Sequence, residues 1–112
     1  MLMATAPLGA GEKLALKVSP AVCFAPANLV VRATIAADHA NRSVEIVAES
    51  DDFYRLSEIE LDGENAPRTN MFEFRSLPSG TYEVRATLRA HDGRALANVR
   101  QQVNVMESGG NR

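Results

Sequence analysis

Apolar residues in this chain of 112 residues recur at every second position along most of its length. The pattern is clearest in the segment 82–88, where Tyr82, Val84 and Ala86 alternate with polar or charged residues. Successive side chains of a β-strand point to opposite sides, so this period indicates strands with one buried face. It recurs in seven segments, at residues 14–18, 29–35, 44–48, 56–61, 72–74, 82–88 and 96–105.

Turn residues separate these segments. Asp92-Gly93 is the strongest hairpin signal, and Pro78 followed by Gly80 suits a tight turn. Seven short strands around one core require two packed sheets. The sequence therefore predicts an all-β protein, an immunoglobulin-like sandwich of about seven antiparallel strands, with a six-stranded barrel as the alternative. We expect the sandwich to span residues 13–106, between a flexible leader at 1–12 and a flexible tail at 107–112.

The stretch from Pro20 to Asn28 contains two prolines, so we expect no regular central strand there. Cys23 and Phe24 within it are expected to point inward and plug the core. Cys23 is the only cysteine, which excludes an intramolecular disulfide and a cysteine-based zinc cluster. We interpret it as a small buried hydrophobic residue rather than a nucleophile.

The charge balance excludes two classes of partner. Twelve Lys and Arg residues against fourteen Asp and Glu residues give a formal net charge of -2. This balance offers no basic field for nucleic acid or for an anionic membrane surface. No apolar run approaches the roughly 20 residues that a membrane span needs. We therefore expect neither nucleic-acid binding nor membrane insertion.

Catalytic motifs are missing from the sequence as well. It contains no G-x-S-x-G nucleophile elbow and no glycine-rich phosphate loop, and both histidines fall in predicted turns. We therefore predict that the chain is not an enzyme and binds no cofactor.

The segment from Met71 to Leu88, M-F-E-F-R-S-L-P-S-G-T-Y-E-V-R-A-T-L, carries a recognisable pattern. It resembles the F-x-F-x-x-L-P-x-G-x-Y-x-V-x-A pattern of bacterial immunoglobulin-like and carboxypeptidase-regulatory-like domains. The amino-terminal half lacks the opening G-x-V-x-D-x-x-G-x-P of the regulatory-like domains. The resemblance implies a β-sandwich that serves as an accessory module of secreted or cell-envelope proteins.

Tyr82 within this pattern can be interpreted physically. Its ring suits the core, and its hydroxyl can bond to the backbone of the preceding corner near Leu77, as in tyrosine corners. The alternative is a half-buried tyrosine with its hydroxyl in water.

Two His-Asp dipeptides are candidate metal ligands: Asp38-His39 and His91-Asp92. In a sandwich of this strand order both loops, and the loop containing Asp62, open at the same end. Imidazole and carboxylate groups that met there could bind zinc or another divalent ion. Because Asp and His are also ordinary turn residues, we expect the two rings to be far apart, exposed and without metal.

A candidate binding tip, Asp52, Phe53, Tyr54 and Arg55, lies at the opposite end, where Asp52 closes an acidic cluster with Glu49 and Asp51. Aromatic rings there could stack on a sugar or a peptide, and carboxylates could accept hydrogen bonds. The alternative is a solvated loop in which Phe53 folds back onto the core.

A row of arginines occupies the outward positions of the last two predicted strands. We expect them to pair across strands with glutamates and to form a solvated face. The residues concerned are Arg85, Arg89, Arg94 and Arg100 with Glu45, Glu49 and Glu83.

The function that these observations favour is a non-catalytic immunoglobulin-like accessory module with a protein or polysaccharide partner, acting as a spacer, docking or adhesion unit. The resemblance implies a bacterial secreted or envelope location. The alternative is a ligand- or metal-binding β-sandwich that uses its loop-end residues.

Overall fold

The computed structural model describes residues 13–107, and the predicted leader at 1–12 and almost all of the predicted tail lie outside this range. The described chain is all-β apart from one short 3-10 turn, η1 (Gly63–Asn65). The strands are β1 (Leu14–Ser19), β2 (Val22–Phe24), β3 (Ala27–Ile35), β4 (Ser43–Glu49), β5 (Tyr54–Glu60), β6 (Thr69–Leu77), β7 (Gly80–Arg89) and β8 (Ala95–Met106). No helix in the described part of the chain is long and apolar enough to cross a membrane.

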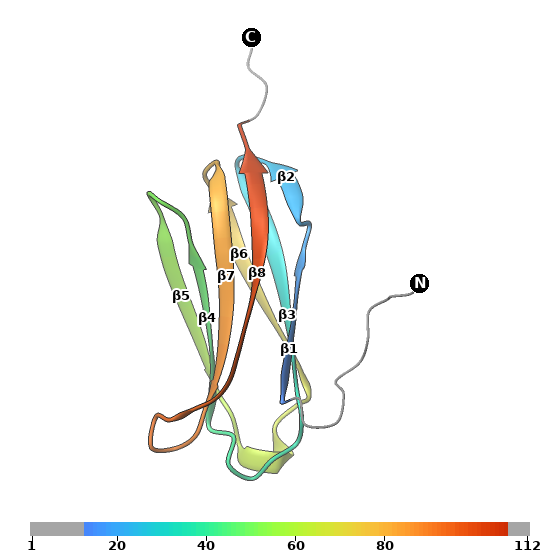
Figure 1. Cartoon of the computed structure of the whole chain (residues 1–112). Coiled ribbons are helices and arrows are strands. Elements are labelled where there is room, and N and C mark those ends of the chain that lie inside the picture. Colours follow the sequence, from blue (N-terminus) through green and yellow to red (C-terminus); the bar gives the residue numbers. More distant parts are fainter. Residues whose placement is uncertain (1–12, 108–112) are drawn as a thin grey trace, which may run out of the picture.

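Two sheets face each other, as the sequence predicts. One has three strands in the order β1-β3-β6, and the other has five in the order β2-β8-β7-β4-β5. Figure 1 shows the strands running along the long axis of the molecule, with β1 beginning at the lower end and β8 finishing at the upper end. The expected number and direction of strands need correction, because there are eight and β2 pairs with β8 in parallel.

The extra strand is β2, which lies between Pro20 and Pro26 at the edge of the five-stranded sheet. An edge position tolerates flanking prolines because one side of the strand needs no ladder hydrogen bonds. The expectation that Phe24 plugs the core is wrong, since it is 59% exposed. Adjacent residues of a strand point to opposite sides, so only Cys23 can face inward, and it packs partly buried against the core.

The buried faces of most strands match the predicted alternation. The residues with almost no exposed surface include Leu29, Val31, Val44, Ile46, Phe74, Leu77, Tyr82, Val84, Leu88 and Val103. The fourth predicted segment is the exception, because Leu56 is 47% exposed while Leu61 is buried beyond the end of β5. Leu56 and Ile59 are an odd number of positions apart, so one strand cannot place both on the same face.

Tyr82 forms the predicted corner. Its side chain is fully buried, and its hydroxyl donates a 2.7 Å hydrogen bond to the carbonyl oxygen of Pro78, four residues earlier. Burial raises the pKa of this phenol above its ordinary value. The bond ties the start of β7 to the turn that follows β6, and so fixes where the chain crosses between the sheets.

Candidate functional site

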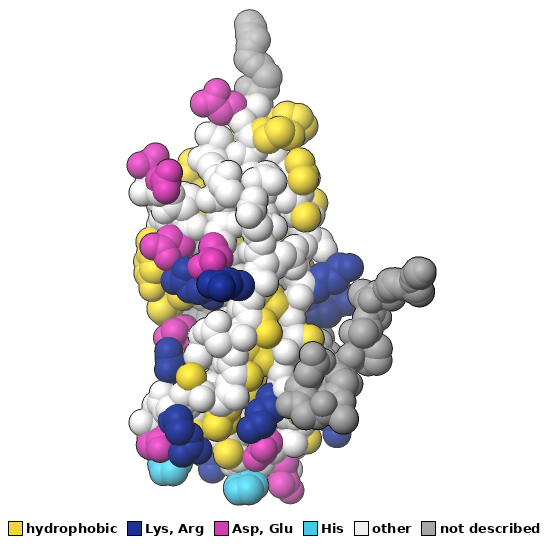
Figure 2. All heavy atoms as spheres, in the orientation of Figure 1, with side chains coloured by type: hydrophobic (Ala, Val, Ile, Leu, Met, Phe, Trp, Pro, Cys, Tyr) yellow, Lys and Arg dark blue, Asp and Glu magenta, His cyan; other side chains and the backbone are white. Residues whose placement is uncertain are grey.

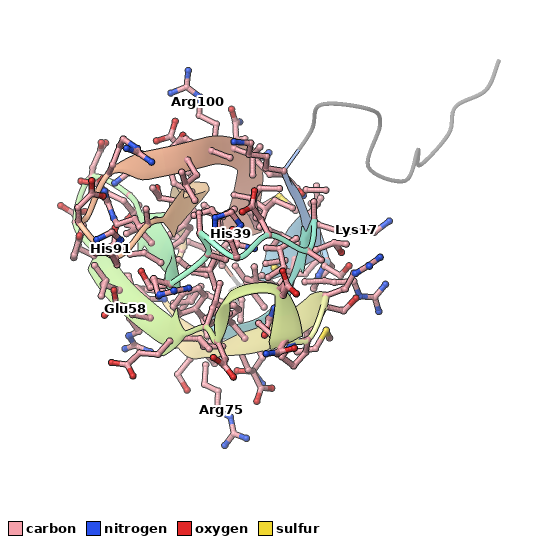
Figure 3. The ribbon with its side chains drawn as sticks, turned by 90° about the horizontal axis from the view of Figure 1, so that it is seen from below. Lys17, His39, Glu58, Arg75, His91 and Arg100 are labelled. Atoms are coloured by element: carbon pink, nitrogen blue, oxygen red, sulfur yellow. The ribbon has the colours of Figure 1, made fainter. Side chains whose placement is uncertain are left out.

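The two His-Asp dipeptides lie at the same end of the molecule, as predicted. His39 is in the connection between β3 and β4, His91 is in the turn between β7 and β8, and η1 occupies the connection between β5 and β6. Figure 3, seen from this end, shows His39 and His91 on separate loops.

The carboxylates of both dipeptides are engaged within their own turns. The ring of His39 is 90% exposed, and its Nδ1 lies 3.5 Å from Oδ1 of Asp38. Asp38 also accepts a hydrogen bond from the N–H of Ala40, and Asp92 accepts one from the N–H of Arg94, which lowers the pKa of Asp92. Within residues 13–107, no three His, Cys, Asp or Glu side chains are grouped so that they could hold a metal ion. Both carboxylates therefore act as turn residues.

Zinc at micromolar concentration is accordingly expected to leave the melting temperature of the protein unchanged. Two imidazoles that shared one ion would need nitrogens within about 4–5 Å of each other, because each Zn–N bond is roughly 2.1 Å long. Thermal melts with and without zinc would check this, with His39→Ala and His91→Ala as controls. A saturable rise in melting temperature that either substitution removed would contradict it.

Asn41 at this end is not singled out by the sequence, because it lies in the polar stretch D-H-A-N-R that is typical of a turn. It is 1% exposed, and its Nδ2 donates to the carbonyl oxygen of Ala36. The backbone carbonyl oxygen of Asn41 accepts hydrogen bonds from the N–H of Gly63 and from Nη1 of Arg42. Asn41 therefore ties the β3–β4 connection to the loop that contains Gly63, while its side-chain oxygen is buried without a hydrogen-bond partner in the described chain.

The aromatic pair of the predicted binding tip is divided between two faces. Phe53 is partly buried and meets the ring of Tyr82 edge to face, with centroids 5.9 Å apart. The guanidinium carbon of Arg55 lies 5.0 Å from the Phe53 ring centroid. Tyr54 is 57% exposed, and Asp52 is exposed as well. Phe53 thus belongs to the core, and only Tyr54 offers a ring to a ligand.

Arg85, Arg89 and Arg100 of the predicted row lie on the outer face of the five-stranded sheet, where Arg85 and Arg100 line a depression of about 530 Å³, and Arg94 lies in the turn before β8. Arg85 contacts Glu49 at 2.9 Å and Glu83 at 2.7 Å, and Arg100 contacts Glu83 at 3.5 Å. The hydrogen bond from Arg85 lowers the pKa of Glu83. Arg89 pairs with Glu45 as expected, whereas Arg94 pairs with Asp92 instead. The charges on this face are largely satisfied by one another.

A second depression, of about 630 Å³, runs along β1 and is called here the β1 depression. Its lining includes Leu16, Lys17, Val18, Arg32, Thr34 and Gln101. Sequence reasoning missed it because the depression depends on β1 pairing with β3 and lying beside β8, which periodicity cannot show. Unlike the outer face of the five-stranded sheet, it contains basic side chains with no acidic partner among the described residues.

No protein-family model matches the chain, and no curated protein matches its sequence. Solved structures with a similar fold include the following two. One is the superoxide reductase (neelaredoxin) from Ignicoccus hospitalis, at a TM-score of 0.62 and 13% identity, over 84% of this chain and 80% of that one. The other is a family 76 glycoside hydrolase from a bovine Bacteroides thetaiotaomicron strain, at a TM-score of 0.59 and 18% identity. That match covers 83% of this chain but only 20% of the hydrolase.

Proposed function

We propose that this chain is a non-catalytic immunoglobulin-like accessory module of a bacterial secreted or envelope protein, and that it acts as a spacer and docking unit. The observation that carries the proposal is the placement of the chain ends. The chain enters the two-sheet unit at the lower end of β1 and leaves it at the upper end of β8 (Figure 1). A unit with this geometry lengthens a polypeptide by its own long dimension when it is inserted in line.

The immunoglobulin-like part of the proposal is supported by the strand order and the corner. β1 and β2 are one edge segment that crosses from the three-stranded to the five-stranded sheet. When they are counted together, seven strands remain in two sheets, as in immunoglobulin-like sandwiches. Tyr82 lies near the start of β7, and its hydroxyl donates to the carbonyl oxygen of Pro78 in the preceding turn, which is the arrangement of a tyrosine corner.

The non-catalytic part of the proposal is supported by the hydrogen bonds and ion pairs that the polar side chains make within the protein. Arg85 pairs with Glu49 and Glu83, and Asp92 bonds to a turn N–H, so these groups are engaged in structure. Both similar structures are enzymes by name, but likeness at 13% and 18% identity extends to the fold alone. The hydrolase match, one fifth of a longer chain, is consistent with a unit of this size serving as part of a larger protein.

A tandem fusion tests the spacer role. Two copies of the full chain joined end to end are expected to melt at the same temperature as one copy, and to give a scattering profile of two units in line. A superoxide-removal assay on the single chain is expected to stay at background. Fusion copies that fail to fold independently, or superoxide turnover above background, would overturn the proposal.

A further inference from the structure

The two sheets both have free edges on the side where β1 and β8 are neighbours. β1 is the outer strand of the three-stranded sheet. β2 pairs with β8 only from Asn104 to Met106, so within the described chain no strand forms a backbone ladder with the edge from Ala95 to Val103, although β1 lies near it. Unpaired edges of this length are places where another extended chain can add a strand.

The side chain of Gln101 on β8 pairs with the backbone of β1 in the way that a peptide group of a neighbouring strand would. Its side-chain amide accepts a 3.0 Å hydrogen bond from the N–H of Val18 and donates a 3.1 Å bond to the Val18 carbonyl oxygen. It therefore occupies the place that one peptide group of a neighbouring strand would take. Because backbone groups alternate in direction along a strand, those of Leu14 and Leu16 point to the same side as those of Val18.

The floor of this side is apolar. The apolar residues that line the β1 depression are Ala15, Leu16, Val18 and Ala21, and Leu16 packs partly buried against the core. Hydrophobic side chains are visible between β8 and β1 in Figure 2. A segment with alternating apolar residues could thus bury one face here while its backbone paired with the edge.

The charge beside this edge is of one sign. Lys17 on β1 lies directly opposite Arg32 on β3 in the antiparallel register, and both side chains are exposed. Like charges in opposed positions destabilise a sheet. Neither residue has a carboxylate of the described chain within 4.0 Å, whereas Arg85 on the other sheet has two.

Protection of a sheet edge does not account for this pair. A lysine on an edge strand commonly deters unwanted strand addition, which would suffice to explain Lys17. Arg32, however, lies on β3, the central strand of its sheet, where there is no edge to protect. The two cations together reject basic strands and favour an occupant that carries negative charge.

We propose that the β1 depression docks an extended peptide segment whose carboxylates face Lys17 and Arg32 and whose apolar side chains cover the floor beside Leu16. The segment adds as a strand to the part of the β1 edge beside Leu14 and Leu16, next to the position at Val18 that Gln101 already occupies. This inference deepens the proposed docking role and names the class of partner. It is independent of the tandem-fusion result, which reports only on the spacer role.

A short blocked peptide of alternating glutamate and valine is a suitable probe, with its lysine-valine counterpart as the control. Titrated into the full chain, the acidic peptide is expected to shift the amide resonances of Leu14, Leu16 and Gln101, and the basic peptide to leave them unchanged. The double variant Lys17→Glu with Arg32→Glu should weaken binding by about tenfold or more, because two attractive contacts become repulsive.

Arg75→Glu is the matched control variant. Arg75 lies on β6 of the same sheet, pairs with Glu73 at 3.0 Å and points away from Lys17 in Figure 3. It should bind the acidic peptide as the unaltered chain does. Absence of shifts at millimolar peptide, or equal binding by the Lys17/Arg32 variant, would overturn the proposal. Shifts at these residues with a carboxylated polysaccharide but not with the peptide would overturn it in favour of a glycan.

Discussion

Replacing Tyr82 with alanine is expected to lower the free energy of unfolding by about 3–5 kcal/mol, because it removes a fully buried ring and leaves a cavity. The ring also supports Phe53, whose edge-to-face contact with it is lost in the same variant. Urea or guanidinium denaturation monitored by circular dichroism would measure the change.

Tyr82→Phe separates the hydroxyl from the ring. It keeps the packing but leaves the carbonyl oxygen of Pro78 without its hydrogen bond, so a loss of about 1–2 kcal/mol is expected. A Tyr82→Phe variant as stable as the unaltered protein would show that the corner bond contributes nothing. If Tyr82→Ala were equally neutral, the ring could not be part of the core.

Phe74→Ala is expected to have an effect of similar size, about 3–5 kcal/mol, because this side chain is 2% exposed in the centre of β6. Met71 provides the matched comparison on the same strand, since it lies on the opposite face and is 51% exposed. Met71→Ala should change stability by about 0.5 kcal/mol or less. Equal destabilisation by the two substitutions would be incompatible with the observed faces of β6.

Periodicity predicted the parts of the fold that depend on neighbouring residues. The inner faces around Val31, Ile46 and Val84 follow directly from the alternation of apolar residues. The positions of the turns between strands follow from the glycine, proline and aspartate residues in them. The corner at Tyr82 was also predictable, because its partner Pro78 lies only four residues away. One error arose where alternation was not applied strictly, because Cys23 and Phe24 were both expected to point inward although adjacent strand residues face opposite sides.

The candidate sites were harder to predict because they depend on which strands pair. Topology correctly put His39 and His91 at one end, but it carries no information on how each ring points. Asn41 has the sequence context of an exposed turn, and only the approach of Gly63 from another loop explains its burial. The opposition of Lys17 and Arg32 requires the register of β1 against β3, which separate segments do not determine.

The parallel pairing of β2 with β8 has a mechanical consequence. The N–H of Asn104 donates to the carbonyl oxygen of Ala21 and the N–H of Ala25 donates to that of Met106, so these bonds join the segment around β2 to the last strand of the described chain. Tension between the two ends would pull β8 upward and the β1–β2 segment downward. The bonds would then be loaded in shear, all at once, rather than peeled apart singly. The pairing of the short strand β2 with β8 thus increases the force that is needed to extend the chain.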